Sequence, residues 1–289
     1  MVRVSQPGSL HCVTIGISNL LPGGANTLNH FDTRCVQRVY SHRVRVLSVT
    51  HGTCVPGGVF EATVEAAGHV LERWSLPLGG TPGLARSYDA VMIFGGSMHP
   101  DQDDEFHWLG REEEFLREVL AEGVPAVGVC LGAQMLARAA GVWVAPAASP
   151  EIGWFDVELT PEGREDPVLR AIPARTTAFQ WHSYTFGIPQ GGSELARSTV
   201  CTQAFRVGSA WGIQFHAEVT LAMVEAWVAE EEDELPVPAE EFLDATASRI
   251  AASSELGRSL CSAFLQVAAA RSAQERGATR PATSLPANT

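Results

Sequence analysis

Residues 124–141 read VPAVGVCLGAQMLARAAG, and the spacing of the apolar side chains changes in the middle of this stretch. Residues 125–129 are a short run of small apolar side chains, which is typical of a strand buried inside a parallel sheet. From residue 131 onward, apolar side chains recur at helical spacing instead. The stretch therefore predicts a central strand, a tight turn and a helix.

Cys130 occupies the predicted turn, between Gly128 and Gly132. The two glycines leave room for a sharp bend, which would aim the sulfur out of the sheet. The unpaired N–H groups at the start of the following helix favour a thiolate and would lower the thiol pKa below its usual value of about 8.5. Cys130 is therefore a candidate nucleophile, although many free cysteines are simply small buried apolar residues.

A candidate base follows a second short apolar strand, in the segment 212–220, GIQFHAEVT. His216 and Glu218 are two residues apart, so on an extended chain their side chains point to the same side. The carboxylate could then orient the imidazole, and the imidazole could take a proton from a thiol. Cys130, His216 and Glu218 together form a candidate catalytic triad.

These motifs resemble the class I, or triad-type, glutamine amidotransferase family, and especially the glutaminase domain of GMP synthase. The pattern of that family is a cysteine in G-x-C-x-G-x-Q, here GVCLGAQ, and a later H-x-E, here HAE. Three further segments resemble it: 93–109, IFGGSMHPDQDDEFHWL; 151–160, EIGWFDVELT; and 179–186, FQWHSYTF. The similarity extends over residues 43–220, and several motifs in the family's order are more specific than any one of them.

The resemblance implies a flavodoxin-like three-layer α/β sandwich with a mostly parallel central sheet. It also implies roles for further residues. The backbone N–H groups of Gly96 and Leu131 would form the oxyanion hole, and Gln134 would hold the substrate together with the segment that contains Ser183 and Tyr184. No cofactor or metal ion is implied.

Three positions need separate comment. His182 lies in the segment 179–186 and is a rival base, but the spacing of Glu218 behind His216 favours His216, so His182 is expected to shape the pocket. Family members often have proline where this chain has Ala217, a change that should preserve the triad geometry. Relatives often have an acidic residue where this chain has Tyr184, so Tyr184 could change what the pocket accepts.

Composition limits the possible partners and compartments. The 289-residue chain has 45% hydrophobic residues, enough for a substantial core, and a formal net charge of −13 without a lysine or arginine stripe. Nucleic acid and anionic membranes are therefore not expected partners. Six scattered cysteines without a C-x-x-C pair suggest reduced thiols, and the first residues lack a signal-peptide pattern, which indicates a cytoplasmic protein.

We expect three parts along the chain: an N-terminal extension at 1–42, the amidotransferase domain at 43–232, and a helical C-terminal appendage with a frayed tail at 233–289. The carboxylate run at 101–105 could suggest a metal site, but it directly precedes a helical pattern at 108–120. We interpret it as the acidic start of that helix, where carboxylates complement the helix dipole.

The expected reaction is cleavage of the side-chain amide of glutamine through a cysteinyl γ-glutamyl thioester. About 70 residues follow the triad and no G-x-x-x-x-G-K-[ST] loop is present, so the ammonia acceptor would be a separate synthetase. The favoured interpretation is a subunit that supplies ammonia to that enzyme. The alternatives are a free-standing hydrolase of γ-glutamyl amides or peptides and a catalytically silent binding protein, against which the intact triad argues.

Overall fold

A computed structural model describes residues 43–52, 55–231, 233 and 235–278. The chain divides into two units, Met1–Val39 and Tyr40–Thr289, and the description below concerns the second. The predicted N-terminal extension at 1–42 lies outside the described residues.

One half of the central sheet is parallel. Its strands, in spatial order, are β2 (Val70–Ser75), β1 (Arg45–Thr50), β3 (Ala90–Ile93), β4 (Ala126–Val129) and β9 (Ala210–Ile213). The other half is antiparallel and continues from β9 through β8 (Thr202–Val207), β7 (Ser193–Arg197), β5 (Val144–Leu159) and β6 (Arg175–Phe186). The described residues thus form one mixed nine-stranded sheet.

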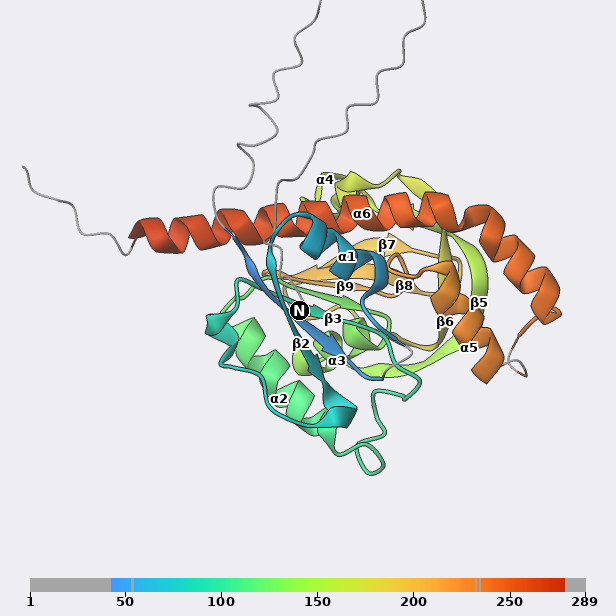
Figure 1. Cartoon of the computed structure of the whole chain (residues 1–289), viewed down its shortest axis with the longest axis horizontal. Coiled ribbons are helices and arrows are strands. Elements are labelled where there is room, and N and C mark those ends of the chain that lie inside the picture. The colour runs from blue at the N-terminus through green and yellow to red at the C-terminus, as the bar shows by residue number, and fades with distance from the viewer. Residues whose placement is uncertain (1–42, 53–54, 232, 234, 279–289) are drawn as a thin grey trace, which may run out of the picture. The chain divides into compact units, whose positions relative to one another are not determined.

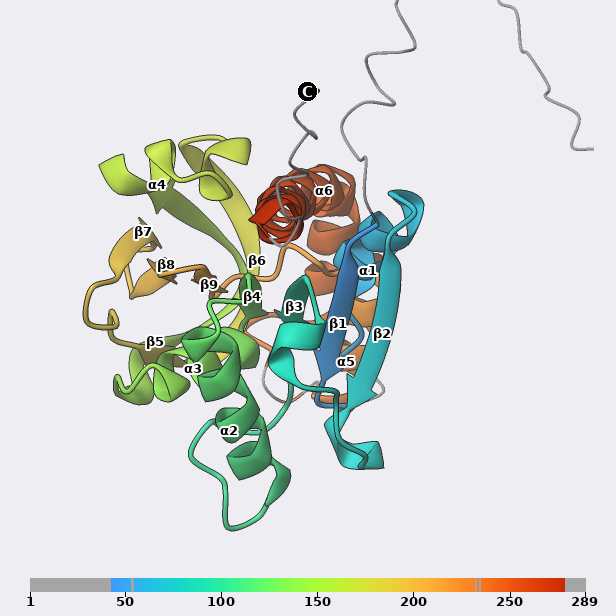
Figure 2. The ribbon, with the colours of Figure 1, turned by 90° about the vertical axis from the view of Figure 1, so that its left-hand side faces the viewer.

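Helices cover both faces of this sheet (Figures 1 and 2). One face carries α1 (Gly58–Ala66) and α6 (Ala239–Ala278), and the other carries α2 (Trp108–Ala121) and α3 (Leu131–Ala139). The remaining helices are α4 (Pro161–Glu165), α5 (Leu221–Glu230) and the 3₁₀ turns Leu76–Leu78, Ala85–Ser87 and Leu169–Ala171. The predicted three-layer α/β architecture is confirmed.

The apolar run in β3 shows why the sheet needs helices on both sides. Ala90 and Met92 belong to the buried cluster under α1 and α6, whereas Val91 and Ile93 belong to the cluster under α2 and α3. All four side chains are fully buried. A strand covered on both faces has no reason to alternate polar and apolar residues, which is why it reads as a continuous apolar run.

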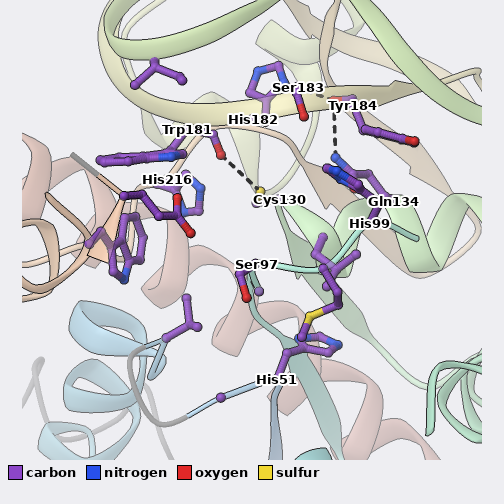
Figure 3. A pocket seen from close by; sticks show the side chains of 18 of the residues that line it. His51, Ser97, His99, Cys130, Gln134, Trp181, His182, Ser183, Tyr184 and His216 are labelled. Atoms are coloured by element: carbon purple, nitrogen blue, oxygen red, sulfur yellow. Dashed lines mark hydrogen bonds between the residues drawn. The ribbon is translucent and has the colours of Figure 1, made fainter. Parts of the chain in front are cut away.

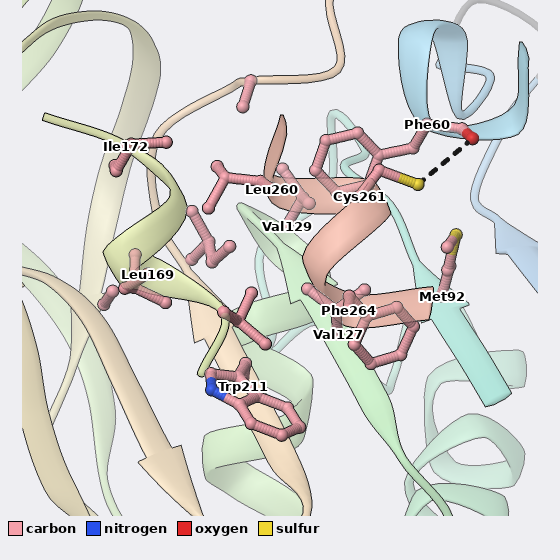
Figure 4. Close-up of a cluster of buried hydrophobic side chains, with 14 of the residues drawn as sticks. Phe60, Met92, Val127, Val129, Leu169, Ile172, Trp211, Leu260, Cys261 and Phe264 are labelled. Carbon is pink, nitrogen blue, oxygen red and sulfur yellow. Dashed lines mark hydrogen bonds between the residues drawn. The ribbon is translucent and has the colours of Figure 1, made fainter. Parts of the chain in front are cut away.

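The C-terminal helix α6 is a structural part of the core (Figure 4). Leu260 and Phe264 are buried in the same cluster as the strands, and the Phe264 ring lies edge-on to Trp211 with centroids 6.1 Å apart. The Cys261 thiol donates to the carbonyl oxygen of Phe60 at 3.5 Å. Helix α6 therefore packs in the same core as the sheet, and a domain boundary at residue 232 stays a prediction. Despite its 40 residues, α6 is not apolar enough to cross a membrane, and neither is any other described helix.

Candidate active site

Four neighbouring parallel strands end at one edge of the sheet, and the predicted site residues follow directly after them. His51 follows β1, Gly95 and Gly96 follow β3, Cys130 follows β4, and His216 lies shortly after β9. Open α/β sheets place their sites at this carboxyl edge. All of these residues except Gly95 line one cavity of about 630 Å³, a volume typical of a small-molecule site (Figure 3).

Cys130 lies at a strained turn between β4 and α3. Its φ of 52° and ψ of −112° make it the one non-glycine residue of the described chain with a positive φ. Both glycines of the motif are required by close backbone contacts, because a Cβ on Gly128 would lie 2.3 Å from the Gly132 carbonyl oxygen, and a Cβ on Gly132 would lie 2.3 Å from the Ile93 carbonyl oxygen. Strain of this kind costs about 1–3 kcal/mol and is concentrated at functional sites.

His216 is buried and bonded to Glu218. Its Nδ1 lies 2.7 Å from Glu218 Oε1, and the two residues are 2% and 0% exposed. His216 Nε2 has no hydrogen-bond partner in the described part of the chain. A backbone bond from His216 N to Phe179 O, 2.8 Å long, fixes this segment against β6. The Glu218 carboxylate therefore lies where it can orient the His216 ring.

Helices α1 and α6 both contact the backbone of the segment from His216 to Glu218. Val59 N in α1 donates to Glu218 O at 2.8 Å, and a Cβ on Gly58 would lie 2.1 Å from that oxygen. On α6, a Cβ on Gly257 would lie 2.0 Å from the carbonyl oxygen of Ala217. The C-terminal helix thus packs directly on the backbone between His216 and Glu218.

Cys130 and His216 lie next to each other beside Gly95. A Cβ built on Gly95 would lie 3.3 Å from His216 Cε1 and 3.7 Å from Cys130 Cβ. Burial by itself lowers the pKa of His216, but the charges of Glu218 and Cys130 outweigh burial and raise the pKa to about 10. The imidazole can therefore hold a proton beside the sulfur, as a group that protonates a leaving group must.

The glycine pair after β3 is held by a buried histidine that the sequence analysis missed. His51 Nδ1 lies 3.0 Å from Gly95 O, and His51 Nε2 lies 2.9 Å from Glu112 Oε2. A carbonyl oxygen and a carboxylate thus hold the two nitrogens of this ring. A trans peptide points its C=O and N–H in opposite directions. Because Gly95 O faces His51, the Gly96 N–H points away from His51.

Gly96 also lies next to the start of α3. A Cβ on Gly96 would lie 3.0 Å from Leu131 Cδ2 and 2.7 Å from His51 Cβ, so only glycine fits there. The structure thus brings the two residues predicted for the oxyanion hole together beside Cys130. The signal that could have revealed His51 is its place immediately after a buried parallel strand.

The predicted substrate-binding residues form the opposite wall of the cavity. Gln134 Nε2 donates to Tyr184 O and to Gln214 Oε1, both at 3.2 Å, which ties α3 to β6 and to the end of β9 (Figure 3). Ser183 is exposed and also lines the cavity. Trp181 contributes its carbonyl oxygen, which lies 3.8 Å from Cys130 Sγ.

The Tyr184 side chain is part of the cavity rim. Its ring stacks on His99 with centroids 4.3 Å apart, and its hydroxyl donates to Asp101 Oδ2 at 3.3 Å. Tyr184 therefore connects β6 to the loop that follows β3.

The carboxylates at 101–105 are not the acidic start of a helix, so that expectation was wrong. Helix α2 begins at Trp108 and has no acidic residue in its first turn. Asp103 instead pairs with Arg138 of α3 at 2.7 Å, and Arg138 also pairs with Glu113 of α2 at 2.9 Å. Arg138 thus fixes the loop beside the cavity.

A second group of histidine, glutamate and cysteine is distinct from the predicted triad. His182 Nε2, Glu151 Oε2 and the Cys201 sulfur lie within 4.8 Å of one another. Glu151 Oε2 also accepts from Gln203 Nε2 at 2.8 Å and from the Ser198 hydroxyl at 3.1 Å.

The Glu151 carboxylate connects the members of this second group. Its Oε2 accepts the amide of Gln203 and the hydroxyl of Ser198, whereas its Oε1 is buried without a hydrogen-bond partner in the described part of the chain. Burial, together with the charge of Glu151, raises the pKa of Cys201 to about 11. We therefore interpret the group as a hydrogen-bonded network around Glu151.

Comparison with known proteins agrees with this fold. The family model of class I glutamine amidotransferases matches residues 33–229. A crystal structure of a glutamine amidotransferase from Thermotoga maritima has a TM-score of 0.71 and 28% identity, and the match covers 79% of this chain and 99% of that one.

Three curated relatives are also similar. The putative glutamine amidotransferase-like protein YfeJ of Salmonella typhimurium is 27% identical over 66% of this chain and 83% of its own length. A glutamine-hydrolyzing GMP synthase subunit of Sulfurisphaera tokodaii is 32% identical over 47% of this chain and 70% of its own length. The gamma-glutamyl-L-1-hydroxyisopropylamide hydrolase of a Pseudomonas species is 29% identical over half of each chain. The model match over most of the chain means that this protein belongs to the class I glutamine amidotransferase family.

Proposed function

We propose that this protein hydrolyses a γ-glutamyl amide bond, with Cys130 as nucleophile, His216 as acid and base, and Glu218 as the group that orients His216. The observation that carries the proposal is the buried bond between His216 and Glu218 beside the strained Cys130 turn. Together these residues supply a nucleophile, a base and an orienting group.

In the first step the Cys130 thiolate attacks the side-chain carbonyl carbon of the γ-glutamyl group. A C–S bond forms, the C–N bond breaks, and protonated His216 gives its proton to the departing nitrogen. Neutral His216 then takes a proton from water as the water attacks the thioester. The C–S bond breaks, glutamate leaves, and Cys130 is restored.

The oxyanion of each tetrahedral intermediate would be stabilised by the N–H groups of Gly96 and Leu131. The support for Gly96 is the bond between His51 and Gly95 O, which fixes the peptide that carries this N–H. The support for Leu131 is its place as first residue of α3, where backbone N–H groups lack helical partners. Gln134, with the segment of Ser183 and Tyr184, would hold the amino-acid end of the substrate.

The cavity favours a substituted amine over ammonia as the leaving group. A subunit that donates ammonia commonly completes its site only when its partner binds, whereas the proposed triad, glycine pair and Gln134 all come from this one chain. The cavity also continues past His216 to Trp227 and the end of α5. The similarity to a γ-glutamyl amide hydrolase agrees with this preference.

Ammonia supply to a separate synthetase is the second candidate, and the similarity to the GMP synthase subunit of Sulfurisphaera tokodaii favours it. Steady-state assays of the purified chain distinguish the two. We expect kcat/KM for a substituted γ-glutamyl amide to exceed that for glutamine at least tenfold, or ~1.4 kcal/mol in transition-state binding. Glutaminase activity that appears only with a second protein would contradict this preference and support ammonia supply.

A further inference from the structure

The hydrogen-bonded network around Glu151 holds a buried carboxylate without an arginine or lysine partner in the described part of the chain. Glu151 is 0% exposed, and its one ion-pair contact among the described residues is with His182. Its Oε2 accepts from neutral donors, Gln203 and Ser198, and its Oε1 is buried without any hydrogen-bond partner there. A buried charge is costly unless a countercharge compensates it. The network therefore has room for a cation in its charge balance.

The His182 ring presents a lone pair to this carboxylate. Its Nδ1 lies 3.0 Å from the Tyr184 carbonyl oxygen, which only accepts, so Nδ1 carries the hydrogen and Nε2 of the neutral ring is free. Nε2 lies 3.2 Å from Glu151 Oε2 but is not hydrogen-bonded to it. Two electron-rich atoms at this distance without a bond between them indicate a shared cation. A metal-binding histidine typically donates its other N–H to a carbonyl, as His182 does.

Cys201 offers the third ligand atom. Its sulfur lies 3.5 Å from Glu151 Oε2, and the ligand atoms of the three residues lie within 4.8 Å of one another. Zinc holds nitrogen and oxygen at about 2.0 Å and sulfur at about 2.3 Å, so tetrahedral angles place N and O ligands about 3.3 Å apart and S and O ligands about 3.5 Å apart. The separations of 3.2 Å and 3.5 Å in this chain agree with those values.

We propose that Glu151, His182 and Cys201 bind a zinc ion. The ion would supply the countercharge of Glu151 and displace the proton of the Cys201 thiol, which leaves to solvent. Its fourth position would take water, because Cys201 is only half-buried. The bonds from Gln203 and Ser198 would remain, as the outer hydrogen bonds that orient a ligating carboxylate. The site is separate from the proposed catalytic residues and does not depend on their chemistry.

The zinc site would fix the substrate-binding wall of the cavity (Figure 3). Glu151 and His182 are cross-strand partners in β5 and β6, and Cys201 directly precedes β8. The Tyr184 carbonyl oxygen lies against His182 Nδ1 and also accepts from Gln134 Nε2 at 3.2 Å. An ion bound to His182 would therefore hold the carbonyl that positions Gln134, and glutamine should bind more tightly when zinc is present.

Zinc titration of the Cys130→Ala protein tests the site, because this background removes the thiol of the proposed triad. After treatment with a chelator and dialysis, calorimetry and elemental analysis should show one zinc ion per chain. Cobalt(II) in place of zinc should give the charge-transfer absorption of a cobalt–sulfur bond. The midpoint of thermal unfolding should rise with the zinc concentration, because an ion that binds the folded chain stabilises it.

Variants in the same background connect the ion to its ligands. Cys201→Ser should remove both the zinc and the cobalt–sulfur band. Ser198→Ala removes one hydrogen bond to Glu151 and should weaken zinc binding about 10–100-fold. The matched control is Cys261→Ser, which changes a buried thiol that contacts the Phe60 carbonyl oxygen and should keep one zinc ion per chain. Circular dichroism verifies that each variant is folded.

The outcomes separate the site from the network alone. Zinc lost in folded Cys201→Ser and kept in Cys261→Ser supports the site. No zinc bound by the folded parent, or equal binding by the parent and Cys201→Ser, would overturn it and leave a hydrogen-bonded network only. Glutamine affinity of the Cys130→Ala protein should rise severalfold with zinc, and an unchanged affinity would contradict the effect on the substrate-binding wall. None of these measurements needs turnover, so a failure of the proposed hydrolysis would not alter them.

Discussion

His182 Nε2 lies 3.2 Å from Glu151 Oε2, so the histidine that could rival His216 belongs to a buried pair of its own. Its other nitrogen, Nδ1, lies 3.0 Å from the Tyr184 carbonyl oxygen. Nδ1 is thus bound within the substrate-binding wall, whereas Nε2 lies next to Glu151 without a hydrogen-bond partner in the described chain. The same carbonyl accepts from Gln134, so Glu151 and His182 act on the substrate-binding wall.

Substitution of the two histidines should therefore have different kinetic effects. His216→Ala should abolish turnover. His182→Gln, which keeps a donor for Glu151, should mainly raise KM and still allow acyl-enzyme formation, because it loosens the wall that holds Gln134. Steady-state kinetics and intact-mass detection of the acyl-enzyme distinguish these effects. Loss of acyl-enzyme in folded His182→Gln with activity retained in His216→Ala would reverse the assignment.

His51 should influence catalysis without contacting the substrate's amino-acid end. His51→Leu removes the bond to Gly95 O and lets the Gly96 N–H turn away, so kcat should fall while KM changes little. The loss should stay below the ~10²–10³ typical of deleting an oxyanion-hole donor outright. Because Glu112 would lose its buried partner, thermal unfolding must be measured in parallel. An unchanged kcat in the folded variant would contradict this role.

The carboxylate of Glu218 should control the alkaline limb of the pH profile of kcat. Burial lowers the pKa of His216, and Glu218 and Cys130 raise it to about 10. Glu218→Gln removes one of the raising charges, so the pKa of His216 falls and the proton needed by the leaving group is lost at lower pH. We expect kcat to fall by about 10²–10⁴ at neutral pH and the alkaline limb to move toward lower pH. A profile that matches the unsubstituted protein would argue against the pairing.

The contact between α6 and the triad segment is testable with two glycines in helices. Gly257→Ala places a Cβ 2.0 Å from Ala217 O, so it should destabilise the protein by about 1–3 kcal/mol and lower kcat. Gly110→Ala in α2 meets nothing within 4 Å and should stabilise by about 0.4–1 kcal/mol with activity kept. Chemical denaturation and kinetics of both variants are compared. Equal effects would show that α6 does not support the site.

The parallel half of the fold and the Cys130 turn could be predicted because their causes are local. The change of period at Cys130 and the two flanking glycines are visible within a few residues. Likewise, Glu218 stands two residues from His216, so spacing alone suggested the bond between them. These features need no knowledge of distant partners.

The features that the sequence did not reveal depend on distant contacts. His51 and Glu112 are 61 residues apart, and nothing near either of them indicates the pair. Glycine is unfavourable inside a helix, so the sequence alone gives no reason for Gly257. The structure shows that Gly257 is the position where α6 approaches the backbone of Ala217. The pairing of β7 and β8 into the same sheet depends on partners that their own short sequences do not specify.

The most direct measurement for the proposed mechanism is covalent labelling with a glutamine-directed electrophile, such as a diazo-ketone analogue, followed by peptide mass spectrometry. We expect one label per chain, on Cys130, with complete loss of γ-glutamyl amide hydrolysis, and neither label nor hydrolysis in Cys130→Ala. Cys201, whose pKa is raised by burial, should stay unmodified. Labelling of Cys201 in place of Cys130, or full hydrolysis by Cys130→Ala, would contradict the assignment of Cys130 as nucleophile.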